Sequence, residues 1–526
     1  MNKFTRDMTI QTSIGYTENG SIKRTTTANY VLDMFAVGGA FRERSEQDII
    51  KLFSDAFDED PNLAMKCLFY LRDVRGGQGE RRFFRVAYGW LCGEHSNIAR
   101  KHLEFIPEYG RWDDLIDICY NASPLFDQEF IEMIAKQIDL DYASKTPSLL
   151  AKWMPSENAS SAETKAKANW IIGLLPDVTP REYRQKLSAI RKKINILERL
   201  MSENRWDEIE FDKIPSKAGM KYRNAFAVKE VTAARYAEFM KNKTTKVNAA
   251  VLNPVDIADK VINKHEGRDQ ISRNVLNKYW DNLKDYYNGR EENAIAVVDT
   301  SGSMWGTPIA AAVGMGMYVA EKSHGPFAHH FITFSDEPKM EHISGKDIVD
   351  KINNLKNANW GMSTNIEAVM DLILATAVKG RYSQSDLPAR IYIFSDMEFN
   401  SCMRGNGDRR NSWGFGGYRD NAYFETLFEN IEKRFTRYGY KMPKVTFWNL
   451  QCRNEKNIPA IGDNFNYISG FSMSQMEAVM SGKTAWDMCL DVLLGKRYEC
   501  IGVKGAARGA NKRNTVKPDK KWSTTF

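Results

Sequence analysis

The sequence predicts a multidomain chain, with an N-terminal all-α part followed by a C-terminal α/β part that carries a doubly wound, Rossmann-like sheet. The first part repeats apolar residues at helical spacing, whereas continuous apolar runs bounded by turn residues appear after residue 288. Those runs alternate with helical segments. We expect an N-terminal extension (1–28), a helical part (29–287), an α/β part (288–498) and a basic, disordered tail (499–526).

Two helix starts can be identified in the helical part. Ser45 precedes Asp48 by the spacing of a capping box, ahead of an apolar run. Asp60 followed by Pro61 places an N-cap before a proline at the first helical position. Further apolar stripes occur at residues 83–91, 98–105, 115–118 and 187–200. Such a succession, with short Gly, Pro and Asn connections, predicts a HEAT-like helical repeat array.

In the α/β part, strand and helix patterns alternate. Strands are expected at residues 294–298, 327–334, 389–394, 444–450 and 466–468, and helices at 308–321, 347–355, 365–378 and 423–435. Ligands of a doubly wound sheet bind beyond the carboxyl ends of its strands. The chemistry is therefore expected just after Val298 and just after Phe394.

Side chains with oxygen atoms follow both of these strands. Asp299, Ser301 and Ser303 form a D-x-S-x-S turn, Asp396 follows the later strand, and Thr364 lies in a loop between them. Hard divalent cations prefer oxygen ligands, and Mg²⁺ keeps octahedral geometry with several waters. The five residues predict a Mg²⁺ (or Mn²⁺) site whose open position accepts the Asp or Glu of a protein partner.

These five residues resemble the metal-ion-dependent adhesion site (MIDAS) of von Willebrand factor A (VWA) domains. The segments VVDTSGSM, FSDMEF and VTFWNL, together with LRDVRGGQGERRFF and YGRWDDL, are similar to the DUF2828 family. That family resembles in layout the Ro/TROVE proteins, in which a ring of helical repeats binds structured small RNA and carries a VWA domain. The resemblance implies a TROVE-like helical domain, a VWA domain and RNA binding.

Two groups of basic residues are candidates for RNA phosphate contacts. The first surrounds a glycine-rich turn at a helix start, where backbone amides also favour anions, and comprises Arg72, Arg75, Arg81, Arg82 and Arg85. The second lies on the polar face of a helix and comprises Arg184, Lys186, Arg191, Lys192 and Lys193. Ion pairs within the protein explain both groups equally well. Phosphate contacts would confer no DNA sequence specificity.

Composition indicates a folded protein without a membrane span. The 526 residues are 43% hydrophobic and 27% charged, and no apolar run approaches the roughly 20 residues that cross a bilayer. The net charge is +7, but residues 501–526 alone carry seven basic residues against Asp519, so the whole-chain charge does not indicate nucleic-acid binding. Seven cysteines without a C-x-x-C pair indicate free thiols and a cytoplasmic location.

Known catalytic motifs are not found in the sequence. Residues 481–484 end like a Walker A loop, but Glu477 stands where its first glycine belongs. No base is positioned near Ser301 or Ser303, so we expect a non-enzymatic function. Two alternatives stay open, an RNA-binding protein of Ro-like layout and a metal-dependent protein–protein interaction scaffold without nucleic acid.

Overall fold

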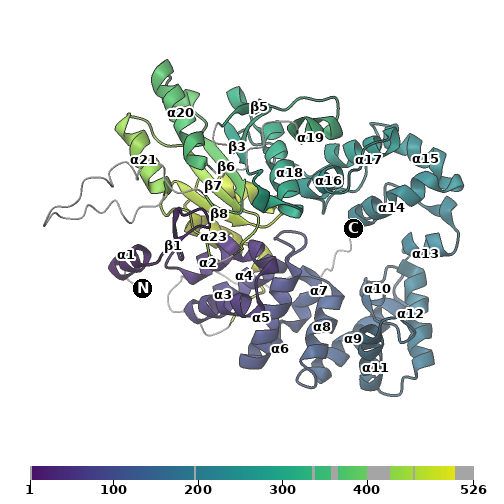
Figure 1. Ribbon diagram of the computed structural model, residues 1–526. Coiled ribbons are helices and arrows are strands. Elements are labelled where there is room, and N and C mark those ends of the chain that lie inside the picture. Colours follow the sequence, from purple (N-terminus) through teal and green to yellow (C-terminus); the bar gives the residue numbers. More distant parts are fainter. Residues whose placement is uncertain are drawn as a thin grey trace.

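The computed structural model describes residues 3–194, 197–333, 338–356, 365–399, 427–453 and 456–503. Figure 1 shows a curved succession of helices, coloured purple to teal, and a sheet-containing part in green and yellow. Both ends of the helical succession contact the sheet-containing part. The two parts predicted from the sequence are therefore present.

Helices dominate the N-terminal part. In chain order they are α1 (Lys3–Thr12), α2 (Tyr30–Val37), α3 (Glu46–Glu59), α4 (Pro61–Arg72), α5 (Arg81–Glu94), α6 (Ser96–His102), α7 (Ile106–Tyr109), α8 (Trp112–Asn121), α9 (Asp127–Ala143), α10 (Leu150–Trp153), α11 (Ala162–Leu174), α12 (Pro180–Ile194), α13 (Leu197–Ser202), α14 (Ser216–Val228), α15 (Glu230–Lys241), α16 (Pro254–Ile262) and α17 (Gln270–Asp281), with a 3₁₀ turn η1 (Gly38–Glu43). The Ser45 side chain accepts a hydrogen bond from the backbone N–H of Asp48, and Asp60 accepts one from Leu63, so both predicted helix starts are confirmed. Among the described helices, none has the length and apolar character needed to cross a bilayer.

The C-terminal part is built on a six-stranded sheet of order β5-β4-β3-β6-β7-β8. Its elements are β3 (Ala294–Val298), α18 (Thr307–Lys322), β4 (His330–Thr333), β5 (Met340–His342), α19 (Ile348–Lys356), α20 (Ile366–Gly380), β6 (Arg390–Ser395), α21 (Leu427–Arg437), β7 (Lys444–Asn449), β8 (Phe465–Ser469), α22 (Met476–Met480) and α23 (Ala485–Leu493). Neighbouring strands are parallel except β5, which is antiparallel to β4. The sheet is therefore mixed, and β5 was not among the strands expected from the sequence, because a partly exposed strand this short carries no apolar pattern.

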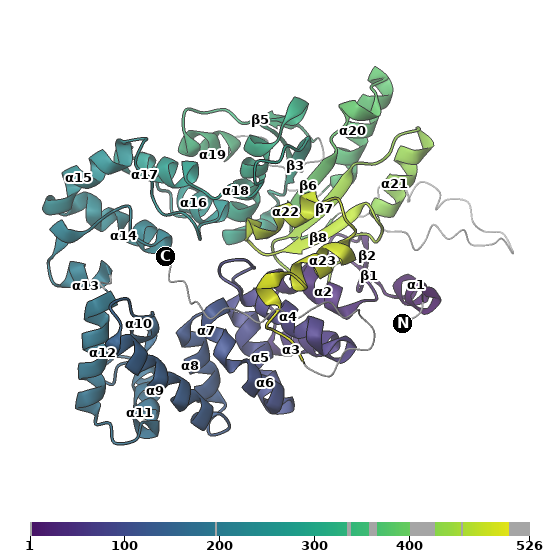
Figure 2. The same cartoon turned by 180° about the vertical axis from the view of Figure 1, so that it is seen from behind.

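Helices cover both faces of the sheet. Gly316 of α18 approaches Val298 so closely that a Cβ there would lie 2.4 Å from a Val298 methyl group. Phe428 of α21 packs against Phe447, with ring centroids 4.7 Å apart. Val298 pairs with Phe394, which pairs with Trp448, so these side chains lie on one face of the sheet. Phe447 precedes Trp448 in β7 and therefore points to the opposite face. Behind the sheet, β8 lies beside α2 and α23 (Figure 2).

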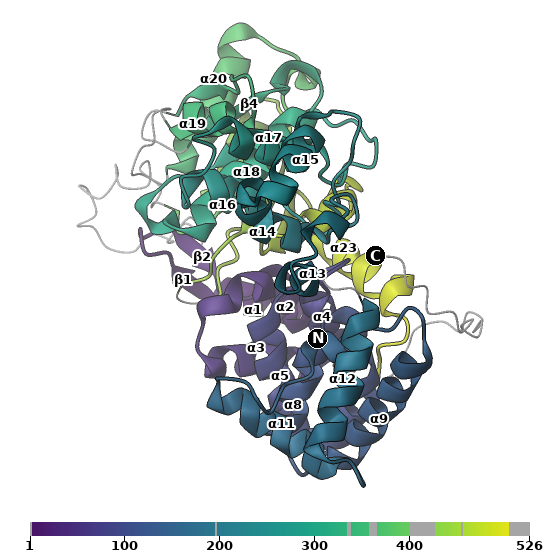
Figure 3. The same cartoon turned by 90° about the vertical axis from the view of Figure 1, so that its right-hand side faces the viewer.

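The two ends of the described chain pack on opposite parts of the molecule. A hairpin of β1 (Ile14–Tyr16) and β2 (Ile22–Arg24) contacts the α/β part, where Thr17 donates to the carbonyl oxygen of Phe399 at 2.6 Å. After α23 the chain returns to the helical part (Figure 3), and the ammonium of Lys66 donates to the carbonyl oxygen of Tyr498 at 2.6 Å. Ile501 is fully buried, so the packed chain continues beyond the expected boundary at 498.

Candidate functional site

The D-x-S-x-S turn and Asp396 lie at the same edge of the sheet. β3 and β6 are parallel neighbours in which Val298 pairs with Phe394. The backbone N–H of Asp299 donates to the carbonyl oxygen of Phe394 at 3.0 Å. The carboxyl ends of the two strands therefore bring Asp299 and Asp396 together, as the argument from strand ends predicts.

Asp299 organises the turn that follows β3. One of its carboxylate oxygens accepts a hydrogen bond from the backbone N–H of Ser301 at 2.9 Å, and the other accepts one from the hydroxyl of Ser395. The hydroxyl oxygens of Ser301 and Ser303 lie 2.9 Å apart. Three of the predicted ligands thus share one short turn, and Ser395 ties that turn to the end of β6.

Asp396 lies beside this turn, with a fully buried side chain. Its Oδ1 accepts a hydrogen bond from the backbone N–H of Glu398 at 3.2 Å. Within the described residues, Oδ2 has no hydrogen-bond partner. A buried acceptor without a partner is costly, so the position of Oδ2 favours a further ligand.

The electrostatics of the pair favour a cation. Burial, and then the charge of Asp396, raise the pKa of Asp299 to about 7. Burial also raises the pKa of Asp396. A divalent ion would offset the two like charges. With the hydroxyls of Ser301 and Ser303, the two carboxylates form a set of oxygen donors that fits Mg²⁺ or Mn²⁺.

Thr364, the fifth predicted ligand, lies outside the described residues. The described chain resumes at Asn365, whose side chain caps α20 by accepting a hydrogen bond from the backbone N–H of Ala368. In the described ranges, no group of three or more His, Cys, Asp or Glu side chains could hold a metal ion. The mixed set of hydroxyls and carboxylates at 299–303 and 396 therefore stands as the candidate centre.

Arg453 is a residue of this site that sequence reasoning missed. It follows β7, and its Nη2 donates to the carbonyl oxygen of Ser303. Its Nε lies 3.6 Å from Oδ2 of Asp396. Only the residues after β3 and β6 were expected at this edge, although β7 is the parallel neighbour of β6 and ends there too. A survey of every parallel strand end would have included Arg453.

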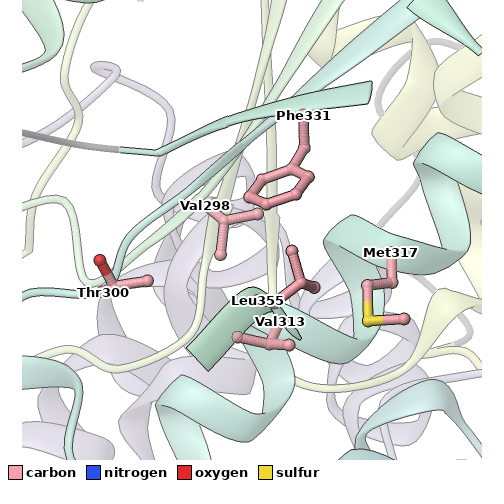
Figure 4. Close-up of a pocket in the computed structure, with 6 residues that line it drawn as sticks. All are labelled: Val298, Thr300, Val313, Met317, Phe331 and Leu355. Carbon is pink, nitrogen blue, oxygen red and sulfur yellow. The ribbon is translucent and has the colours of Figure 1, made fainter. Parts of the chain in front are cut away.

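A small apolar cavity lies behind the turn. Figure 4 shows its lining side chains, which are those of Val298, Thr300, Val313, Met317, Phe331 and Leu355. Thr300 is the polar residue among them, and its hydroxyl has no partner in the described part of the chain. The lining offers no acid or base, so the cavity is a packing gap beside the candidate centre and not a catalytic pocket.

The first basic group is largely paired with acidic residues of α8. Arg72 is 2% exposed, and its Nε and Nη2 lie 2.9 and 2.5 Å from Oδ2 of Asp114. The Nε atoms of Arg81 and Arg85 lie 3.3 and 2.8 Å from Oδ1 of the same carboxylate. The assignment of Arg72 to a phosphate-binding surface is therefore corrected, because the side chain is buried in an ion pair.

Arg75 and Arg82, the other members of the first group, remain at the surface. Arg75 donates to the carbonyl oxygen of Glu108, and Arg82 donates to that of Arg44. These contacts involve main-chain carbonyl groups and leave both positive charges exposed. Of the five arginines that the sequence suggested, Arg75 and Arg82 are therefore the two that are exposed without a carboxylate partner among the described residues.

The second basic group divides in the same way. Arg191 donates to the carbonyl oxygens of Ala151 and Met154 at 2.7 and 2.9 Å, and burial lowers its pKa. This correction makes Arg191 a helix-packing residue. The other four members of the group are exposed. Arg184 pairs with Glu157, and Lys186 lies 3.8 Å from Asp139. Lys193 donates to the carbonyl oxygen of Tyr142, and the fourth exposed residue is Lys192.

Comparisons with known proteins match both parts of the chain. The family model of Domain of unknown function (DUF2828) matches residues 17–136 and 176–288, and that of Domain of unknown function (DUF7788) matches residues 293–515. Uncharacterized protein L728 of Acanthamoeba polyphaga mimivirus is 30% identical over 512 residues, which cover 90% of this chain and 85% of that protein. The crystal structure of the Deinococcus radiodurans RO (RSR) protein is similar with a TM-score of 0.39 and 13% identity, over 89% of this chain and 99% of that one.

Proposed function

The chain belongs to the DUF2828 family, whose name assigns no activity, and we propose from the site itself that it is a non-enzymatic, divalent-cation-dependent binding protein. The C-terminal part would act as a VWA-type domain. Asp299, Ser301, Ser303 and Asp396 would hold Mg²⁺ or Mn²⁺, with Thr364 as the fifth ligand. When bound, the ion supplies positive charge and an open position for the carboxylate oxygen of a protein partner.

The unsatisfied Oδ2 of Asp396 is the observation that carries this proposal. It lies in a fully buried side chain, beside a second buried carboxylate and a turn of hydroxyls. The described residues around the turn supply no histidine or lysine in contact with Ser301 or Ser303 that could act as a base. Without an activated nucleophile, ligand binding is favoured over catalysis.

Calorimetric titration with Mn²⁺ tests the proposal. The wild-type chain should bind one equivalent, and Asp299→Asn should weaken binding at least about tenfold, because the substitution removes a ligand charge. Leu372→Ala, at a partly exposed position on α20, is a control that should bind like the wild type. Absence of Mn²⁺ binding by a folded wild-type chain, with or without an acidic peptide, would refute the metal function.

Binding of structured small RNA by the helical part is the second candidate function. The exposed basic side chains of α12 support it, since phosphate contacts need accessible positive charge. The protein would then hold RNA through its helical part and an acidic protein through its metal, in the cytoplasm. If RNA does not bind, the alternative is a metal-dependent interaction scaffold without nucleic acid.

A gel-shift assay with structured RNA at about 50 mM and about 200 mM salt distinguishes these alternatives. Lys186→Glu combined with Lys192→Glu should abolish binding and flatten its salt dependence. Lys51→Glu combined with Lys213→Glu, at side chains that are 76% and 69% exposed, is a matched double charge reversal that should have little effect. Equal binding by the two variants would exclude α12 as the RNA contact.

A further inference from the structure

The segment after β7 brings a positive charge to the candidate metal centre. Ser395 pairs with Asn449 in the sheet, so the residues that follow β7 emerge beside Asp396. The Arg453 side chain is 33% exposed, whereas that of Asp396 is fully buried. Among the described residues, Arg453 is the basic side chain paired with this carboxylate.

The guanidinium of Arg453 is held near the carboxylate of Asp396 without forming a hydrogen bond to it. Nη2 of Arg453 donates to the carbonyl oxygen of Ser303, which fixes one side of the group. Nε lies 3.6 Å from Oδ2 of Asp396, which is too long for a hydrogen bond. In the described part of the chain, neither Nε nor Oδ2 has a hydrogen-bond partner. The two groups therefore attract each other through charge, and no strong directional bond opposes their separation.

We propose that Arg453 is a built-in cation that competes with the divalent ion for Asp396. The proposal rests on the proposed metal function. An ion held by Asp299 and Asp396 brings two positive charges next to the guanidinium, and charges this close interact strongly when they are partly shielded from water. The metal therefore displaces Arg453 from Asp396, and the arginine lowers the affinity of the site for the metal.

The backbone around Arg453 is anchored, so that displacement moves the side chain and not the loop. The guanidinium of Arg44 donates to the carbonyl oxygen of Arg453. The backbone N–H of Cys452 donates to the carbonyl oxygen of Ala40 at 3.1 Å, and the Gln451 amide donates to Glu43 at 2.8 Å. A side chain on a fixed backbone stays close to Asp396 after it is displaced. Its return is therefore fast and reversible, as competition requires.

Calorimetric titration of the full chain with Mn²⁺ alone, at about pH 8 where protons compete least for the carboxylates, tests the competition. Arg453→Gln should bind Mn²⁺ about tenfold more tightly than the wild type, because it removes the repelling charge. Arg453→Lys keeps the charge and loses the planar group, so its affinity should stay close to that of the wild type. Arg290→Gln is the control, because it removes the same charge at the other end of the strands, before β3. Arg290 pairs there with Glu477 at 3.1 Å, and its substitution should leave the Mn²⁺ affinity unchanged.

Each result has one meaning. Equal or weaker Mn²⁺ binding by Arg453→Gln would overturn the competition while the metal function stands. Arg453→Lys binding as tightly as Arg453→Gln would also overturn it, since the lost contact with Ser303 and not the charge would then be the cause. Absence of Mn²⁺ binding by every folded variant and by the wild type would instead refute the proposed metal function.

Discussion

Asp114 and Asp396 are two of the fully buried carboxylates of the described chain, and they differ in their counter-charges. Asp114 is surrounded by the guanidinium groups of Arg72, Arg81 and Arg85 and accepts a further hydrogen bond from the backbone of Arg111. Asp396 has one arginine at 3.6 Å and an oxygen without a partner in the described chain. The comparison shows that an acidic residue with its own counter-ions holds helices together, whereas one short of positive charge is suited to bind a cation.

Removing one of the arginines that surround Asp114 gives the largest expected effect on stability. Arg72→Met should lower the free energy of unfolding by about 3 kcal/mol, because it leaves part of a buried ion pair without its partner. Urea denaturation followed by circular dichroism measures this change. Arg75→Gln, at an exposed position, should change it by less than about 0.5 kcal/mol. If Arg72→Met unfolds at the wild-type urea concentration, Asp114 is not the structural centre inferred here.

A smaller effect on stability is expected when Asp396 is substituted. In metal-free buffer, Asp396→Asn should change the free energy of unfolding by less than about 1 kcal/mol, since the substitution removes a buried charge that has little compensation. Asp114→Asn, the matched substitution, should cost about 3 kcal/mol because it leaves three arginines without their common carboxylate. Equal losses in urea denaturation would remove the distinction between the two centres.

The smallest effect concerns the contact between the end of the chain and the helical part. His102 is buried, and its Nε2 accepts a hydrogen bond from the backbone N–H of Gly502 at 3.3 Å. Burial lowers the pKa of His102 below its usual 6.5, so neutral His102 stabilises the fold above that pH. As the pH falls below about 6.5, His102 is protonated in the unfolded chain while the buried imidazole of the folded chain stays neutral. The unfolded state is thereby favoured, and the free energy of unfolding decreases.

His102→Gln isolates this contribution because glutamine does not titrate. Between about pH 7.5 and 5.5, the wild type should lose on the order of 1 kcal/mol of unfolding free energy relative to the variant. Urea denaturation at the two pH values provides the measurement. Parallel losses in both proteins would show that His102 does not supply the pH dependence.

Features encoded in neighbouring residues could be predicted from the sequence. The limits of β3 follow from one apolar run, and the caps at Ser45 and Asp60 follow from a few residues of local pattern. The approach of Asp299 to Asp396 could also be predicted, because parallel strands place their carboxyl ends together. Each of these features depends on a short segment or on one general rule of sheet topology.

Features that depend on distant partners could not be predicted in the same way. The arginines near residue 80 suggested a phosphate surface because nothing local indicated that Asp114 would reach them. Arg453 was missed since its role depends on the order of strands in the sheet. The antiparallel strand β5 and the β1–β2 hairpin are too short to show a period of two. Counting charges along a segment therefore says little about which of them remain available.

The N-terminal hairpin packs on the α/β part and the segment after α23 packs on the helical part. This arrangement has a consequence for expressing the two parts separately. A fragment cut at residue 287 would lose the partner of its hairpin, and one that begins at residue 288 would carry Tyr498 and Gly502 without their helical partners Lys66 and His102. Each half would expose an apolar or hydrogen-bonding surface that the other normally covers. The halves should therefore unfold together as one cooperative unit, and separately expressed halves should regain their stability only when mixed.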